Sequence, residues 1–178
     1  LLQLRVHPTL IPEVKAIAQV DGVLNAVMIN ASGVGELLLV GPGAGSRPTA
    51  SAVMADVVSV ARSLASNEQP SIHSMGVGVS AMSEPAITDI NEVSSAWYLR
   101  LDAEDKPGVM AALSQCLSQH GIGIESLIQK PESAALAKVP VILLTDEAPT
   151  SAIEQAITDI EALSSVGGSV TCLRVENF

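Results

Sequence analysis

The order of hydrophobic periodicities between residues 94 and 175 constrains the fold more than any other feature of the chain. Apolar and polar residues alternate around Trp97, Leu99 and Leu101, which predicts a half-buried strand. The elements predicted to follow are a helix, two strands, a helix and a strand, over residues 107–121, 122–129, 139–145, 151–163 and 170–175. This order is typical of the ferredoxin-like βαββαβ fold, a four-stranded antiparallel sheet with both helices on one face. We therefore predict an α+β protein.

Local signals set the expected boundaries of these elements. Ser151 and Glu154 have the spacing of a capping box, which would begin the second helix. Pro140 has no N–H group, so the third strand is expected to form its ladder only after this residue. Gly167-Gly168 is expected to turn the chain into the last strand. The uncovered face of the sheet and its edge strand favour dimerisation.

The first 92 residues follow a different pattern. We predict a strand, a short helix, a two-stranded hairpin and a long helix, over residues 2–11, 13–21, 23–29 with 36–40, and 48–65. Residues 66–92 are rich in small polar residues and glycine, which indicates a linker, and a short strand over 75–81 is left open. The expected domains are therefore residues 1–65 and 93–178, joined by the linker 66–92.

Two glycine-containing loops each open a helix. The first, Gly41-Pro42-Gly43-Ala44-Gly45, would let a ligand approach bare backbone, but it has neither the G-x-G-x-x-G spacing nor the Walker lysine. A structural turn is therefore the favoured interpretation from spacing alone. The second loop, Asp105-Lys106-Pro107-Gly108-Val109, could present helix N–H groups to a carboxylate or could simply punctuate the chain. Its residues alone do not decide between these two interpretations.

Composition excludes several classes of function. The formal net charge is −10, and lysine and arginine are scattered, so we expect no nucleic-acid partner. No apolar run reaches the roughly 18–20 residues of a membrane span, and no signal peptide is evident, so we expect a cytoplasmic protein without a membrane partner. The two cysteines, Cys116 and Cys172, are expected to be buried reduced thiols.

No catalytic or metal-binding constellation is apparent in the sequence. No pair of residues has the context of a general acid and base, and no cluster has the spacing of a metal site. His7 is expected to be a structural histidine with its hydrogen bonds satisfied, and His120 to cap the end of a helix. The chain also begins at Leu1 without methionine, which we interpret as a sign of truncation. We therefore expect any chemistry to lie elsewhere in a parent protein.

Several motifs resemble the C-terminal part of bacterial homoserine dehydrogenases. The resemblance is carried by residues 6–12, by Gly22 with Asn25-Ala26-Val27, and by the run from Gly41 to Asp56. The second half resembles an ACT domain, an amino-acid-binding regulatory module. That likeness rests on Asp105-Lys106-Pro107-Gly108-Val109, His120-Gly121-Ile122 and residues 124–129. Two positions depart from the family pattern, namely Lys15-Ala16 and Thr145-Asp146.

The resemblance implies a function and a set of site residues. It implies an enzyme that interconverts L-homoserine and L-aspartate semialdehyde with NADP or NAD, of which this chain lacks the catalytic residues. Gly45 would lie against the nicotinamide cofactor, with Gly43 and Ala44 shaping the approach. The ACT domain would bind L-threonine or a related effector between two copies, in a homodimer or higher homo-oligomer. The effector residues would be Asp105, Pro107, Gly108, Val109, Ile128 and Gln129. The alternative is a stand-alone amino-acid-binding or dimerisation module.

Overall fold

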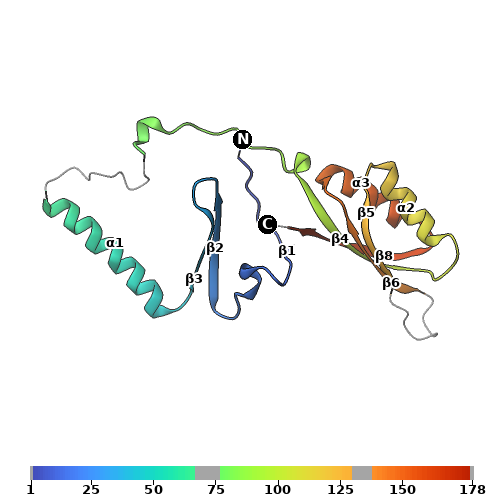
Figure 1. Ribbon diagram of the computed structural model, residues 1–178, viewed down its shortest axis with the longest axis horizontal. Helices are drawn as coiled ribbons and strands as arrows, with labels where there is room; N and C mark the ends of the chain where they lie inside the picture. Colours follow the sequence, from blue (N-terminus) through green and yellow to red (C-terminus); the bar gives the residue numbers. More distant parts are fainter. Residues whose placement is uncertain (1, 67–76, 130–137, 177–178) are drawn as a thin grey trace. The chain divides into compact units, whose positions relative to one another are not determined.

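The chain divides into two compact units that do not follow the predicted domain boundaries. The computed structural model describes residues 2–66, 77–129 and 138–176. One unit consists of residues 1–11 and 85–178, and the other of residues 12–84 (Figure 1). The first eleven residues, which were predicted to belong with the hairpin and the long helix, thus lie in the same unit as the predicted ACT domain.

The predicted βαββαβ order is confirmed in the unit that contains residues 85–178. Its elements are β4 (Ser94–Ala103), α2 (Val109–Gln119), β5 (Ile124–Gln129), β6 (Val139–Thr145), α3 (Thr150–Glu161) and β8 (Val166–Val175). The strands are hydrogen-bonded in the order β8-β4-β6-β5, and all three pairings are antiparallel. This is the strand order of the ferredoxin-like fold.

The core of this unit lies between the sheet and the two helices. Alternate residues of β4 and β6 are buried, as period-two patterning requires. They pack against the apolar stripes of α2 and α3. The largest fully buried side chains of this core include Leu99, Leu113, Leu117, Leu143, Ile153 and Ile160. Aliphatic side chains therefore build nearly the whole core, and Trp97 is its one aromatic member among the described residues.

Two short strands extend the sheet beyond the predicted four. β1 (Thr9–Leu10) pairs in parallel with β8, and β7 (Ala148–Pro149) pairs with β4. The predicted strand over residues 2–11 is thus mostly wrong. Pro8 and Pro12 flank β1, and because proline has no N–H donor they keep the ladder short. Earlier in this segment, Leu2 forms an isolated parallel bridge with Ile87.

Three of the expected boundaries within the βαββαβ unit are also wrong. α3 begins at Thr150 with Pro149 as its N-cap and no side-chain cap, so Ser151 lies inside the helix and forms no capping box. Pro140 already pairs with Asp102 of β4, whereas the pairing of β6 with β5 begins only at Val141, so the missing N–H is tolerated. Gly168 has a φ of +73° within β8, where the register shifts against β4, and thus forms a bulge instead of a turn before the strand.

The unit of residues 12–84 contains the predicted hairpin and long helix. β2 (Leu24–Ala31) pairs with β3 (Gly35–Pro42), and α1 (Ser46–Ser66) follows. The predicted helix over 13–21 is only a 3₁₀ turn, η1 (Ala16–Gln19). Of the strand left open over 75–81, residues 75–76 lie outside the described residues and 79–81 form the 3₁₀ turn η2 (Val79–Ala81). A second such turn, η3 (Ile90–Glu92), lies in the other unit.

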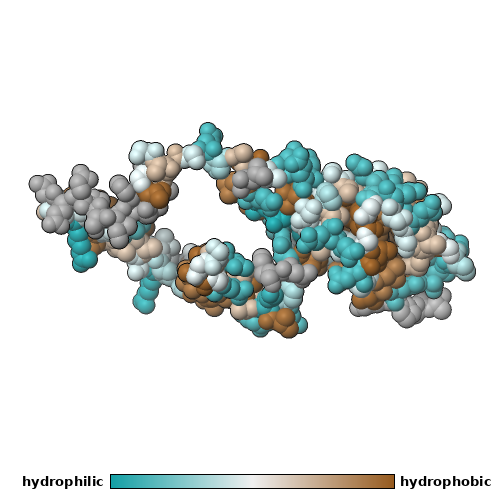
Figure 2. All heavy atoms as spheres, turned by 45° about the horizontal axis from the view of Figure 1, so that its top comes forward, coloured by the Kyte–Doolittle hydropathy of each residue, from teal (hydrophilic) through white to brown (hydrophobic). Residues whose placement is uncertain are grey.

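Much apolar surface of residues 12–84 is exposed. α1 has no buried residue, although it carries exposed Val53, Met54, Val57 and Leu64. The hairpin likewise exposes Val27 and Leu39. Figure 2, in which hydrophobic residues are brown, shows apolar side chains of this kind at the surface.

No helix among the described residues is long and apolar enough to cross a membrane.

Candidate functional site

The glycine turn after β3 owes its residue types to local geometry. Gly43 lies against the side chain of Asn25, and a Cβ atom at position 43 would overlap the Asn25 amide. Gly45 has a φ of +117°, a backbone conformation that residues with a side chain rarely adopt. The local structure therefore explains why glycine stands at positions 43 and 45. Ala44 lies between them. Their assignment as cofactor contacts stays a prediction.

A shallow pocket lies beside this turn. It has a volume of about 350 Å³, and the two strands of the hairpin line it through Asn25, Ala26, Val27, Leu39, Val40, Gly41 and Pro42. Gly43, Ala44 and Gly45 are not among its lining residues. The structure thus brings the start of the glycine run to an apolar depression and leaves the last three residues of the run outside it.

The second loop joins β4 to α2 and has the geometry of an accessible helix start. Gly108 is the N-cap of α2 with a φ of +92°, and α2 has no side-chain cap. A Cβ atom at this position would meet nothing within 4 Å, so the space in front of the loop is open. The first N–H groups of a helix have no partner within the helix. A carboxylate can therefore reach the start of α2 along the backbone of Gly108.

The two walls predicted for the effector site meet within one chain. The Gln129 Nε2 atom at the end of β5 donates a hydrogen bond of 2.9 Å to Oδ1 of Asp105. Ile128, the neighbouring residue, is 49% exposed, and Pro107 is exposed in the loop. Val109 differs, because its side chain is buried in the core, so only its backbone is available to a ligand.

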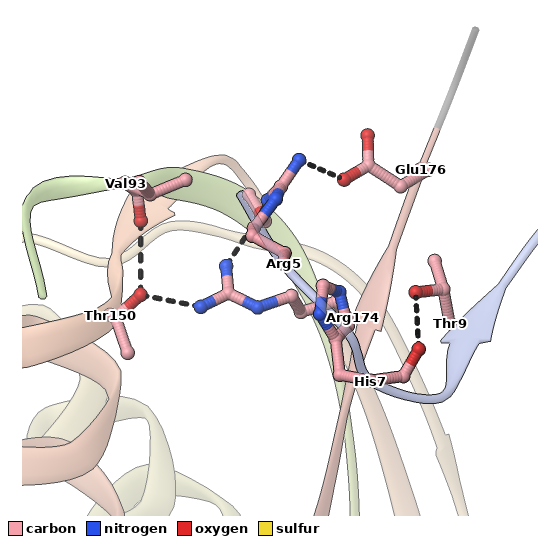
Figure 3. A network of polar contacts seen from close by, with 8 residues as sticks. Arg5, His7, Thr9, Val93, Thr150, Arg174 and Glu176 are labelled. Atoms are coloured by element: carbon pink, nitrogen blue, oxygen red, sulfur yellow. Dashed lines mark hydrogen bonds and ion pairs between the residues drawn. The ribbon is translucent and has the colours of Figure 1, made fainter. Parts of the chain in front are cut away.

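A polar cluster that the sequence analysis missed lies at the opposite end of the sheet (Figure 3). Arg174 of β8 donates to Ser95 Oγ at 2.8 Å and to Thr150 Oγ1 at 2.7 Å, and its guanidinium lies 4.3 Å from the centre of the Trp97 ring. Arg5 donates to the same Ser95 oxygen at 3.3 Å and forms an ion pair of 2.9 Å with Glu176. The cluster thus links the N-terminal segment to β4, α3 and β8.

His7 lies in this cluster and does not have the satisfied hydrogen bonds expected of it. Its Nε2 atom is buried and has no hydrogen-bond partner among the described residues. Burial lowers the pKa of His7, and the positive charges of Arg174 and Arg5 lower it further. The expectation of a satisfied histidine is therefore wrong. The imidazole lies beside two cations.

His120 and the two cysteines have no unusual polar contacts among the described residues. His120 is the C-cap of α2, as predicted, and its Nε2 lies 2.7 Å from Oδ2 of Asp159. Both cysteines are free thiols, with Cys116 buried and Cys172 half-buried. Burial raises the pKa of Cys172 to about 11. Within the described part of the chain, no group of histidine, cysteine or acidic residues could hold a metal ion.

Comparison with known families separates the two halves of the chain. Residues 1–58 match the family described as homoserine dehydrogenase, and residues 97–162 match the ACT domain. The chain joins a homoserine dehydrogenase segment to an ACT domain. The homoserine dehydrogenase match includes the residues of β1, which pairs with β8. Part of this segment is therefore built into the sheet of the unit of residues 1–11 and 85–178, called the ACT unit below.

Relatives of the chain are homoserine dehydrogenases over nearly its whole length. A homoserine dehydrogenase of Pseudomonas aeruginosa is 45% identical over 176 residues, which are 99% of this chain and 41% of the relative. One of Neisseria gonorrhoeae is 39% identical, over 99% of this chain and 40% of its own length. A crystal structure of a homoserine dehydrogenase from Thiobacillus denitrificans has a TM-score of 0.87 and 40% identity, over 98% of this chain and 39% of that one. The chain thus spans about two fifths of these relatives.

The sequence predicted the loop over residues 41–45 and the loop over residues 105–109, but it did not predict the polar cluster. Gly108 follows a strand and precedes an apolar helical stripe, a pattern visible in the sequence. Arg174 and Trp97 face each other only because β8 and β4 pair in a register that places them directly opposite. That register depends on the bulge at Gly168, which residue spacing does not reveal.

Proposed function

We propose that the chain is the C-terminal part of a homoserine dehydrogenase that interconverts L-homoserine and L-aspartate semialdehyde with NADP or NAD. The observation that carries this proposal is the 45% identity to the Pseudomonas aeruginosa enzyme along 99% of the chain. No pair of residues in the sequence has the context of a general acid and base for hydride-transfer chemistry. The 178 residues alone are therefore expected to be inactive, and the complete enzyme acts in the cytoplasm.

The glycine turn is proposed to contact the nicotinamide cofactor in the complete enzyme. Gly45 presents backbone without a side chain at the start of α1, and Gly43 and Ala44 shape the approach to it. The exposed apolar residues of the hairpin and of α1 support a further partner surface, since a helix of this kind is not stable without tertiary packing. We propose that the rest of the enzyme covers them.

The ACT domain is proposed to bind L-threonine as a feedback effector. The open backbone at Gly108 and the start of α2 would hold the carboxylate, and the pair Asp105–Gln129 would bind the ammonium and hydroxyl groups. Pro107, Val109 and Ile128 complete the site. The partly exposed Tyr98, Ile142 and Leu144 on the uncovered face of the sheet support a homodimer in which two ACT domains share the effector.

Calorimetric titration of the chain with L-threonine, L-isoleucine, L-methionine and L-lysine tests the effector site. We expect heat with threonine and its loss in Gly108→Val, because a β-branched residue is strained at a φ of +92° and blocks the approach to the backbone. Gly121→Val is the matched control: Gly121 has a φ of +71°, equally open surroundings and a place at the other end of α2. Binding that is lost equally in both variants would contradict the assignment.

A second experiment tests the enzyme itself. We expect the complete coding sequence to encode a polypeptide that oxidises L-homoserine with NADP or NAD, whereas the 178 residues alone do not. In that complete enzyme, Gly45→Val should raise the KM for the cofactor more than it lowers stability. Turnover by the isolated 178 residues would contradict the proposal, as would a complete protein without activity on homoserine.

A further inference from the structure

A pocket at the polar-cluster end of the ACT unit has features of a binding site. It has a volume of about 340 Å³ and lies between the start of β4, the first turns of α3 and the end of β8. Trp97, Thr150, Ile153, Glu154, Ile157 and Arg174 are among its lining residues. β4 runs from Ser94 to Ala103, so Trp97 and the Asp105–Gly108 loop lie toward opposite ends of this strand. The pocket is therefore separate from the proposed threonine site.

Arg174 is a buried cation that no carboxylate of the described residues contacts as an ion pair, although the charges of Glu176 and Glu154 act on it from further away. The residue is 7% exposed, and its guanidinium donates hydrogen bonds to two neutral hydroxyl groups, Ser95 Oγ and Thr150 Oγ1. No ion pair among the described residues includes Arg174. A guanidinium carries five N–H donors in a planar fork, and burying its charge without an anion in direct contact is unfavourable. A carboxylate in the pocket would supply that anion.

The other lining residues could contact an ammonium group and an apolar side chain of the same ligand. The guanidinium is stacked on Trp97 at 4.3 Å, which fixes the plane of its donors. Glu154 is exposed on α3, lines the same pocket and takes part in no ion pair of the described residues, so its carboxylate is available to an ammonium group. Ile153 and Ile157 offer apolar surface between the two charges.

We infer that this pocket is a second amino-acid site of the ACT unit, which takes an α-amino acid with a short apolar side chain. Arg174 binds the carboxylate, Glu154 binds the ammonium group, and the two isoleucines contact the side chain. The inference does not depend on the proposed dehydrogenase activity or on threonine binding, because none of Asp105, Gly108 and Gln129 lines this pocket.

Intrinsic fluorescence tests the site directly, because Trp97 lines the pocket and is the one tryptophan in the sequence. The 178-residue chain is titrated with L-valine, with isobutylamine, which lacks the carboxylate, and with isovalerate, which lacks the ammonium group. We expect a saturable change with valine and at least about tenfold weaker binding of both analogues, since each loses one charge-assisted contact. No saturable change up to about 10 mM valine, or equal binding of isovalerate, would overturn the inference.

Variants assign the response to the pocket. Glu154→Gln and Arg174→Gln should each weaken valine binding about tenfold or more. Glu125→Gln and Arg100→Gln are the matched controls, because both residues are exposed on strands and neither lines the pocket. Gly108→Val should leave the valine response unchanged, and its loss there would place the ligand at the other loop and refute the inference. If circular dichroism shows that Arg174→Gln does not fold, the comparison of Glu154→Gln with Glu125→Gln decides.

Discussion

At the scale of single residues, glycines of this chain serve different physical requirements. Gly43 is small because the Asn25 side chain occupies the space that a Cβ atom would need. Gly108 has open space around it and is selected by its positive φ. A resemblance between sequences groups both as site residues. The structure separates them, since a side chain at position 108 would face solvent, where a ligand can approach, whereas one at 43 would clash within the hairpin.

His7 gives a pH dependence that can be measured. Its pKa in the folded chain lies below the ordinary value of 6.5, so the unfolded chain binds the proton more tightly. The neutral imidazole therefore contributes stability that is complete above pH 6.5 and is lost as the pH falls below it. We expect His7→Gln to reduce the loss of unfolding free energy between about pH 8 and about pH 5, measured by urea denaturation followed at Trp97. An identical pH dependence in both proteins would refute this role.

At the scale of elements, long periodic segments could be predicted from the sequence and short ones could not. β4, β6, α2 and α1 have clear periods of two or of about 3.6 residues, and each was predicted within a few residues of its observed bounds. β1 lies between Pro8 and Pro12, whose missing N–H groups limit the strand more than apolar patterning extends it. η1 has only four residues, too few for a helical period to define. The pocket at Arg174 depends on which strands become neighbours, a property of the assembled sheet.

The ion pair that holds the N-terminal segment to the end of β8 is expected to stabilise the ACT unit measurably. The side chains of Arg5 and Glu176 are 23% and 27% exposed and lie 2.9 Å apart. A double-mutant cycle with Arg5→Met and Glu176→Gln should give a coupling free energy of about 0.5–1 kcal/mol in urea denaturation.

The matched control for this cycle is the pair Lys106–Glu104. Its two atoms lie 3.0 Å apart, but the lysine side chain is 68% exposed, so solvent screens the attraction. A cycle with Lys106→Met and Glu104→Gln should give a smaller coupling, near zero. If Arg5–Glu176 coupled no more strongly than this exposed pair, the ion pair would not hold the N-terminal segment to the end of β8 in solution.

At the scale of the whole molecule, the two units differ in how much of their own core they contain. The ACT unit buries a continuous aliphatic core, whereas α1 has no buried residue. The isolated chain should therefore be cleaved first within residues 12–84 by low concentrations of a protease of broad specificity, while the strands and helices β4, α2, β6 and α3 resist. Mass spectrometry of the fragments gives the order of cleavage. Early cleavage within β4 or α3 would contradict this expectation.

The parallel pairing of β1 with β8 has a consequence for protein engineering. The chain leaves the ACT unit at residue 12 and returns to it at residue 85. The edge strand β1 of that unit thus precedes residues 12–84 in the sequence. A graft cut at residue 93, where sequence patterning places the domain border, would leave that strand behind and bare the backbone donors and acceptors of β8. A transplanted sensor should therefore take residues 2–11 with it, rejoined by a designed linker, if it is to remain free of aggregation in its new host.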